Sequence, residues 1–312
     1  MNKLALAALA ATGWLIASQP VQAVGSEVGL ASARTTTPPH RLAYEPNDHA
    51  MIVLNVTTGS TAVMKDNASS IQSVALSRTG DKVAWLYYYD EPIPSNRIMI
   101  RDTDARHKAR NVLAAHPRKF LWIDSVDWAP TGKRLAFIGA KPNGDTDLWT
   151  VKADGTGLSL VKADVIGCGD NCGRVIWSPD GRKVAYFFDD WDRNKVGWRQ
   201  VTLKTGKTSR LPKCFFGWSP DMKLIGRVLG DGDSPSRLVI SRPNRQGARR
   251  LQVPAPDDWL EYHGGDISWG AGRTIGYRTQ ETDEYVFVDV KTSAITVLAP
   301  TDPTRGGAYD FS

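Results

Sequence analysis

One short phrase recurs along this chain, and it limits the possible folds more than any other feature. Its clearest copy, residues 125–138, reads SVDWAPTGKRLAFI and joins two apolar runs through Pro-x-Gly. Proline presets φ for a turn and glycine can adopt a positive φ, so the phrase predicts two short β-strands and a tight turn. Two further apolar runs, residues 147–151 and 158–161, flank the hairpin signal Asp154-Gly155 and complete a four-stranded unit.

This unit repeats at a nearly constant interval. Each copy has a large apolar anchor just before the turn, and successive anchors lie 52, 49, 41 and 51 residues apart. The anchors are Leu76, Trp128, Trp177, Trp218 and Trp269. In the copy that contains Trp218, Met222 stands where the earlier copies have glycine. A repeat of about 40–50 residues with four short strands is typical of a β-propeller blade.

The two ends of the repeat region are complementary. Residues 41–64 supply a blade without its first strand, and residues 307–312 supply a first strand without a blade. Phe311 lies 42 residues after Trp269, in step with the other anchors. We therefore predict an all-β, six-bladed β-propeller over residues 41–312, with four-stranded antiparallel blades. The C-terminal strand is expected to join the N-terminal blade and close the ring, which leaves few exposed edges.

The N-terminal region has the pattern of an export signal. In residues 1–23, Lys3 precedes an apolar stretch at residues 4–17, and small residues suited to cleavage follow at 21–23. A membrane anchor is the alternative, but the apolar stretch is short for a span. Residues 24–40 are rich in Ser, Thr and Pro and are expected to form a flexible leader. We therefore predict a periplasmic or secreted monomer that does not span a membrane.

The three cysteines are interpreted in the light of this compartment. Cys168 and Cys172 bracket three residues of a loop between two blades, and an oxidising compartment favours a disulfide between them. Zinc is the alternative, although two thiols without a neighbouring histidine are a poor ligand set. Cys214 begins a predicted strand, so we expect it to act as a small buried hydrophobic residue.

The formal net charge of +6 comes from basic residues spread around the predicted ring. Their one dense group is Arg242, Arg245, Arg249 and Arg250, at a turn between a third and a fourth strand. We interpret this group as a solvated turn, because no nucleic-acid recognition motif accompanies it. Nucleic acid is therefore not among the expected partners.

Loop length differs between the two ends of the predicted blades. The turns between strands one and two, and between three and four, share one end and are short; we call this the short-turn face. The connections between strands two and three, and between blades, share the other end and are long; we call this the long-loop face. Function concentrates in loops on rigid scaffolds, and Trp, Tyr and Arg dominate interfaces. The candidate partner-binding residues are therefore Tyr89, Trp122, Trp191, Arg193, Trp259, Tyr262 and His263. In the alternative interpretation, residues 189–194 are a solvated hairpin tip and residues 259–263 pack over their blade.

The sequence shows neither an assembled catalytic set nor a metal site. The Ser-Pro-Asp-Gly motif is repeated, which marks it as a turn element, and no Gly-x-Ser-x-Gly elbow is present. Acidic pairs such as Asp145 with Asp147, or Asp231 with Asp233, offer too few carboxylates for a closed calcium site. Spacing gives none of the five histidines a fixed partner: His40, His49, His107, His116 and His263. We therefore expect no catalytic residue, metal or cofactor.

The repeat resembles that of the TolB-type propeller family. Residues 177–186, WSPDGRKVAY, carry the likeness, as do residues 128–137 together with 147–157. TolB is a periplasmic component of the Tol–Pal cell-envelope system, with an α/β domain ahead of a six-bladed propeller. The resemblance covers about residues 41–312 and implies the propeller alone, because only the short 24–40 leader precedes it. It also implies that the long-loop face engages an envelope lipoprotein.

Two functional classes follow. We favour an exported, non-catalytic binding or scaffold propeller that recognises a protein, a glycan or another envelope component through the long-loop face. The alternative is a metal-dependent polysaccharide or oligosaccharide lyase or hydrolase, because some lyases resemble this repeat family and bind a metal through histidines at the channel mouth. Its candidate residues would be Glu261, His263 and Asp266, with Trp191 or Trp259 stacking on sugar rings.

Overall fold

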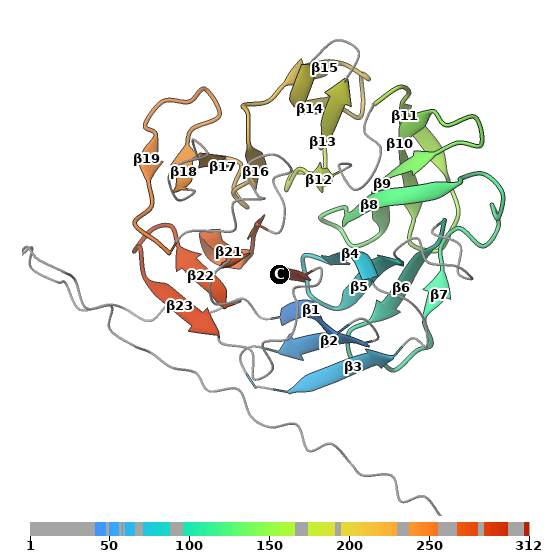
Figure 1. Ribbon diagram of the computed structural model, residues 1–312, viewed down its shortest axis with the longest axis horizontal. Helices are drawn as coiled ribbons and strands as arrows, with labels where there is room; N and C mark the ends of the chain where they lie inside the picture. The colour runs from blue at the N-terminus through green and yellow to red at the C-terminus, as the bar shows by residue number, and fades with distance from the viewer. Residues whose placement is uncertain are drawn as a thin grey trace, which may run out of the picture.

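Six four-stranded antiparallel sheets surround a central axis in the computed structural model (Figure 1). The structure describes residues 41–47, 50–55, 58, 60–65, 71–87, 96–165, 174–190, 195–229, 237–254, 267–279, 284–298 and 309–311. The predicted all-β, six-bladed propeller is therefore confirmed. Nowhere in the described part of the chain is there a helix with the length and apolarity that crossing a bilayer requires.

The strands of each blade are hydrogen-bonded in chain order from the axis to the rim, apart from the strand that closes the ring (Figure 1). Blade 1 consists of β24 (Tyr309–Phe311), β1 (Arg41–Asn47), β2 (Ala50–Asn55) and β3 (Thr61–Lys65). Blade 2 consists of β4 (Ile71–Leu76), β5 (Lys82–Tyr87), β6 (Ile98–Asp102) and β7 (Arg110–Asn111). Blade 3 consists of β8 (Trp122–Trp128), β9 (Arg134–Ala140), β10 (Thr146–Lys152) and β11 (Ser159–Lys162).

The other three blades follow the same plan. Blade 4 consists of β12 (Val175–Trp177), β13 (Lys183–Asp190), β14 (Lys195–Thr202) and β15 (Thr208–Arg210). Blade 5 consists of β16 (Phe215–Trp218), β17 (Ile225–Leu229), β18 (Arg237–Ser241) and β19 (Arg249–Arg250). Blade 6 consists of β20 (Ser268–Trp269), β21 (Thr274–Arg278), β22 (Tyr285–Asp289) and β23 (Ile295–Leu298), with the short 3-10 helix η2 (Ala271–Arg273) after β20.

The C-terminal strand closes the ring. β24 pairs antiparallel with β1, so that Leu42 lies opposite Phe311 and Tyr44 opposite Tyr309. Figure 1 shows the C-terminus next to the axis, where the first strand of blade 1 is needed. The pairing confirms the predicted closure and gives the inner edge of β1 a hydrogen-bonding partner.

The repeated Ser-Pro-Asp-Gly motif builds the turn between the first and second strands. In blade 4 the Ser178 amide donates to the Lys183 carbonyl at 2.9 Å, and the Gly181 amide donates to the Ser178 carbonyl at 2.8 Å. The Ser178 hydroxyl donates to Asp180 at 2.6 Å. Gly181 has a φ of 70°, and Met222 takes the same left-handed conformation in blade 5, with a φ of 61°. The motif is therefore a turn, as the sequence predicts, and it tolerates a side chain at the glycine position.

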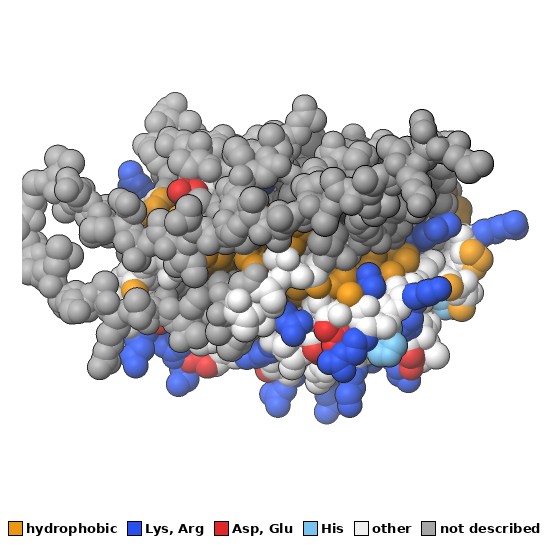
Figure 2. All heavy atoms as spheres, turned by 90° about the horizontal axis from the view of Figure 1, so that it is seen from below, with side chains coloured by type: hydrophobic (Ala, Val, Ile, Leu, Met, Phe, Trp, Pro, Cys, Tyr) orange, Lys and Arg blue, Asp and Glu red, His pale blue; other side chains and the backbone are white. Residues whose placement is uncertain are grey.

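The strand order divides the connections between two faces. Because neighbouring strands are antiparallel, the one-to-two and three-to-four turns lie at one end of every blade and the other connections lie at the opposite end. Figure 2 shows the ring from its side, with many Lys and Arg side chains along the lower edge of the described surface.

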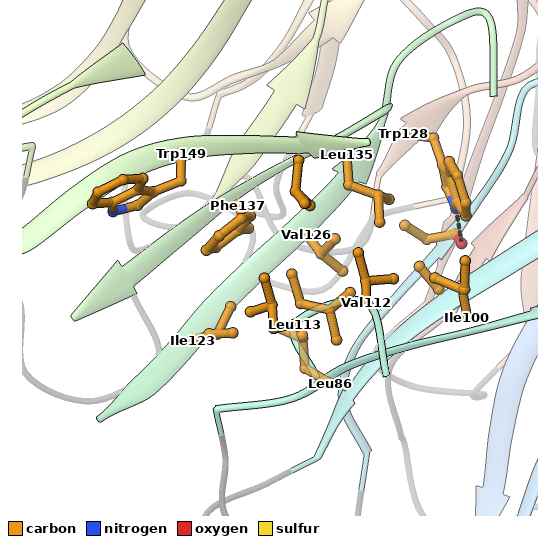
Figure 3. Packing of buried hydrophobic residues seen from close by; sticks show 14 of the residues in the cluster. Leu86, Ile100, Val112, Leu113, Ile123, Val126, Trp128, Leu135, Phe137 and Trp149 are labelled. Carbon is orange, nitrogen blue, oxygen red and sulfur yellow. Dashed lines mark hydrogen bonds between the residues drawn. The ribbon is translucent and has the colours of Figure 1, made fainter. Parts of the chain in front are cut away.

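Each anchor of the repeat packs against the preceding blade. Trp128 is 4% exposed, and its Nε1 donates to the Ala75 carbonyl of blade 2 at 3.1 Å (dashed in Figure 3). The same apolar cluster takes Leu86 and Ile100 from blade 2 and Phe137 from blade 3. The other anchors join clusters with residues of blades 1, 3, 4 and 5 in the same way: Leu76, Trp177, Trp218 and Trp269. Fully burying one such side chain contributes about 1.5–3 kcal/mol, so every blade depends on its neighbour.

The structure describes one of the three cysteines. Cys214 precedes β16 with a φ of 55° and packs against the cluster between blades 5 and 6. Its side chain is only partly buried, so Cys214 is less buried than the sequence predicts. Its position in the turn that enters blade 5 leaves one side uncovered. Cys168 and Cys172 lie outside the described residues, and their disulfide stays a prediction.

Candidate functional site

The structure describes one of the seven predicted partner-binding residues. Trp122 is partly exposed and begins β8, the inner strand of blade 3, at the long-loop end. The other six lie outside the described residues: Tyr89, Trp191, Arg193, Trp259, Tyr262 and His263. The residues of the lyase alternative, Glu261, His263 and Asp266, lie outside them as well. The interpretations of residues 189–194 and 259–263 as a solvated tip and a packed loop therefore stay open.

Trp122 belongs to a well-anchored segment that we call the rim segment, residues 119–122. The Leu121 amide donates to the Ala140 carbonyl at 2.8 Å, and the buried Phe120 lies edge-on to Trp149, with ring centroids 5.4 Å apart. Lys119 Nζ lies 4.6 Å from the centroid of the Trp149 ring. A cation over an indole face is attracted to it. These contacts fix the segment to blade 3.

A glycine makes room for the rim segment. A Cβ on Gly139 would lie 2.8 Å from the ring of Phe120, so only glycine allows that ring to lie against β9. With Phe120 buried beneath it, Leu121 is left 46% exposed at the surface. Sequence reasoning named Trp122 as a candidate, which stays a prediction, and did not name its neighbours Leu121 and Lys119. An apolar Phe-Leu-Trp run in a blade connection was the signal that could have found them.

Two carboxylates link the inner strands around the axis. Asp127 and Asp310 each sit one residue before an anchor position. Asp127 Oδ2 accepts from the Trp177 amide at 2.5 Å and Asp127 Oδ1 from the Trp128 amide at 2.7 Å. Asp310 accepts from the Leu76 amide at 2.7 Å. Each carboxylate therefore satisfies an edge N–H of the next inner strand, which the sheet itself leaves unpaired.

Further polar groups complete this inner layer. The Ser268 hydroxyl donates to Asp310 at 2.9 Å, and the Ser125 hydroxyl accepts from the Val175 amide at 3.1 Å. Arg174 Nη2 donates to the Ile267 carbonyl at 3.0 Å and thereby joins blade 4 to blade 6. Sequence reasoning missed all of these residues. Asp127 and Asp310 share one position of the repeat, and that shared position was the available signal.

Asp127 titrates near neutrality. Burial, helped by the nearby Asp310, raises the pKa of its carboxyl to about 7, although the hydrogen bonds from the Trp177 and Trp128 amides and the charge of Arg174 oppose this shift. A carboxyl that gains and loses a proton near pH 7 changes the charge around the axis. No three His, Cys, Asp or Glu side chains of the described residues come together as a metal site.

Arg78 crosses the axis at the short-turn end. It follows Ser77, the first residue of the blade 2 turn, at the position where the turns of blades 4 and 5 have proline. Its Nη1 lies 3.3 Å from the Pro179 carbonyl and its Nη2 3.5 Å from the Pro220 carbonyl. One side chain therefore connects blade 2 with blades 4 and 5. The substitution of arginine for proline in one repeat was visible in the sequence, but its partners were not.

Of the histidines, the structure describes two, and they lie on opposite faces. His107 is exposed in the turn between β6 and β7 on the short-turn face, where Nδ1 contacts Asp102. His116 is partly exposed in the connection between blades 2 and 3 on the long-loop face. His40, His49 and His263 lie outside the described residues. The two described histidines do not form a common site.

Comparison with known proteins identifies the fold. No family model and no curated protein matches the chain. TolB from Acinetobacter baumannii matches with a TM-score of 0.65 and 15% identity over 86% of this chain, which spans 65% of the TolB chain. A putative TolB from Agrobacterium tumefaciens matches with a TM-score of 0.56 and 12% identity over 87% of this chain and 98% of its own. The described propeller is therefore TolB-like in fold, as the repeat predicts.

An enzyme shares the architecture too. An oligogalacturonate lyase in complex with manganese matches with a TM-score of 0.53 and 15% identity, over 85% of this chain and 76% of its own. At these identities the comparisons establish the fold alone, because one propeller fold carries many functions.

Proposed function

We propose that this chain is an exported, non-catalytic binding propeller that recognises a protein or another cell-envelope component through its long-loop face. The observation that carries the proposal is the rim segment, where Leu121 is 46% exposed next to the partly exposed Trp122. Tryptophan is among the side chains that most often anchor an interface, and the exposed Leu121 extends the apolar surface beside it.

Rigidity makes these side chains effective anchors. The segment is fixed by the Leu121 amide hydrogen bond to β9 and by the burial of Phe120 against Gly139. An anchor that is already ordered loses little conformational freedom on binding, so more of its contact energy appears as affinity. The non-catalytic part of the proposal is supported by the two carboxylates near the axis. Asp127 and Asp310 accept hydrogen bonds from strand amides, which favours a structural role for them.

Export and partner class belong to the same proposal. The signal-like residues 1–23 support a periplasmic or secreted protein, and such a compartment would allow the predicted Cys168–Cys172 disulfide to form. The fold shared with two TolB structures supports an envelope protein or glycan as the partner class. We expect a monomer that begins at residue 24, and the intact mass of the exported protein would check that boundary and the disulfide.

The test compares two exposed leucines. The Leu121→Ser/Trp122→Ala variant removes the proposed anchor, and Leu160→Ser removes a leucine that is 48% exposed on the outer strand of blade 3. Wild type and both variants are immobilised and exposed to envelope extract, to a purified peptidoglycan-associated lipoprotein and to peptidoglycan fragments. We expect a component that wild type and Leu160→Ser retain and that the double variant loses by at least tenfold. Equal retention by all three proteins would contradict the proposal.

A metal-dependent lyase or hydrolase is the second candidate, favoured by the fold likeness to the oligogalacturonate lyase. Its test is thermal unfolding with manganese, calcium and uronic-acid oligosaccharides, with and without chelator. A ligand at a hundredfold excess over its Kd stabilises the folded state by about 2.7 kcal/mol. A shift that chelator abolishes, together with release of unsaturated sugar, would establish the enzyme. His263→Ala should then remove both signals.

A further inference from the structure

The short turns of the ring carry a large excess of positive charge. Ten of these turns lie entirely within the described residues: 77–81, 103–109, 129–133, 153–158, 178–182, 203–207, 219–224, 242–248, 270–273 and 290–294. They contain twelve Lys or Arg and five Asp, which is an excess of seven positive charges. The whole chain has a formal charge of +6, so the remainder of the chain sums to −1. Positive charge is therefore concentrated in the short turns, and Figure 2 shows many Lys and Arg side chains along the lower edge of the described surface.

All five acidic residues of these turns have hydrogen-bond or ion-pair partners in or next to a short turn. Asp180 accepts from the Ser178 hydroxyl at 2.6 Å and from the Arg182 amide at 3.0 Å. Asp221 accepts from the Ser219 hydroxyl and from Arg273. Asp81, Asp104 and Asp154 have partners within or next to their own turns. The carboxylates are thus held by local turn geometry and leave most of the cations unpaired.

Nine of the twelve cations are exposed and have no hydrogen bond or ion pair through the side chain among the described residues. They are Lys108, Lys133, Arg182, Lys204, Lys207, Lys223, Arg242, Arg245 and Lys291. The other three are engaged: Arg78 with the proline carbonyls, Arg106 with Asp104 and Arg273 with Asp221. An unpaired cation keeps its full charge available for an external anion.

The arrangement of these nine cations fits a flat partner. They belong to blades 2 to 6 and stand at the same end of every blade, so they spread over the face of the ring. A small anion would meet one or two of them, whereas a planar array of phosphates meets all of them together. The exposed large apolar residues of the described chain, Leu121, Leu160 and Val196, all lie outside these turns. Binding here would therefore be electrostatic, without insertion into an apolar layer.

We infer that the short-turn face docks on an anionic lipid surface through phosphate headgroups. Basic residues next to an anionic bilayer are attracted by its surface potential over about one Debye length. This orientation turns the long-loop face away from the lipid and leaves it open to a partner. The inference rests on the charge of the turns and stands independently of what the long-loop face binds.

The experiment is vesicle co-sedimentation with the purified full chain. Vesicles of phosphatidylcholine alone are compared with vesicles that also contain phosphatidylglycerol, at low and high salt. Lys204→Glu/Lys223→Glu reverses two cations of the face. Arg118→Glu/Lys213→Glu is the matched control, because it changes the net charge equally at two exposed residues in blade connections on the other face. Soluble polyphosphate and duplex DNA serve as competitors.

We expect binding only to the anionic vesicles, with strong weakening by salt. The short-turn variant should bind at least tenfold more weakly, and the control should stay within about twofold of wild type. Equal weakening by both variants, no preference for anionic vesicles, or tight binding of polyphosphate or DNA that vesicles do not displace would each overturn the inference. Circular dichroism checks the fold, and Lys204→Gln/Lys223→Gln, with an expected intermediate loss, replaces the glutamate variant if that variant fails to fold.

Discussion

At single positions the core of this propeller has no room for one additional carbon atom. Gly226 lies in β17 under the ring of Phe216, and a Cβ added there would lie 2.0 Å from Phe216 Cζ. Phe216 is 1% exposed within the cluster of blades 5 and 6. Neither partner can move without disturbing its neighbours, because protein cores are close-packed.

Gly226→Ala is expected to destabilise the protein by about 1–3 kcal/mol through overpacking. Urea unfolding measures the loss. Phe216→Leu should relieve part of it, so the double variant should be more stable than the two single losses predict. Gly247→Ala is the control for backbone strain alone, because it has open space at a φ of 61° and should cost about 1 kcal/mol. Strict additivity of the Gly226 and Phe216 effects would contradict this account.

Asp127 predicts a pH dependence of stability. Its folded pKa of about 7 lies above the usual 3.8, so the native state holds a proton that the unfolded chain has lost between these values. The free energy of unfolding should therefore fall as pH rises through this window, by at most about 1.4 kcal/mol per unit. Asp127→Asn should flatten the slope, at a cost of about 1–3 kcal/mol for the lost acceptor at Trp177.

The control for this titration is Asp154→Asn. Hydrogen bonds from Thr156 hold the pKa of Asp154 below its usual value, so its titration falls below the window used for Asp127. Urea midpoints at several pH values between about 4 and 7 should show the wild-type slope in this variant. An unchanged slope in Asp127→Asn would show that another group is responsible.

Among the strands, the three-residue β24 makes contacts with three different blades. It gives β1 its inner partner, and through Asp310 it binds the Leu76 amide of blade 2 and the Ser268 hydroxyl of blade 6. Three residues therefore connect blades 1, 2 and 6. The short phrase at the C-terminus predicts this strand, but the two bonds of Asp310 depend on the neighbouring blades.

Deletion of residues 309–312 should open the ring. We expect the Tm to fall by several degrees, because the loss of a few kcal/mol moves the Tm of a large domain by that much. The free edge of β1 should also promote association, which size-exclusion chromatography would detect. Removal of Ser312 alone is the control and should leave both properties unchanged. A monomeric truncated protein with the wild-type Tm would show that closure is dispensable.

At the scale of the whole molecule, the blades form one cooperative system. Each anchor packs into a cluster that includes the preceding blade, and Arg78 and Arg174 join blades that are not adjacent in the chain. In an open repeat array each unit contacts only its neighbours along the chain, and ends can fray. A closed ring has no such end.

Urea unfolding should accordingly show one transition. Far-UV circular dichroism reports the sheets and tryptophan fluorescence reports the contacts between blades, so the two curves should coincide. A fluorescence change that precedes the loss of circular dichroism would indicate that blades separate before they unfold, and would contradict a single cooperative ring.

The sequence by itself determined the blades, their number and the closure, because these follow from local chemistry repeated at a regular interval. Pro-x-Gly turns and apolar runs define strands, and the anchor spacing defines the unit. The same reasoning placed Trp122 at the long-loop end of blade 3, and its role in binding stays a prediction. What only the tertiary structure decided were contacts between units: Arg78 across the axis, the amides bound by Asp127 and Asp310, and Phe120 against Gly139. The partners of Arg78, Asp127 and Asp310 lie about a blade or more away in sequence, and the repeat spacing does not predict such contacts. The contact of Phe120 depends on the space that Gly139 leaves by having no side chain, which the repeat spacing does not predict either.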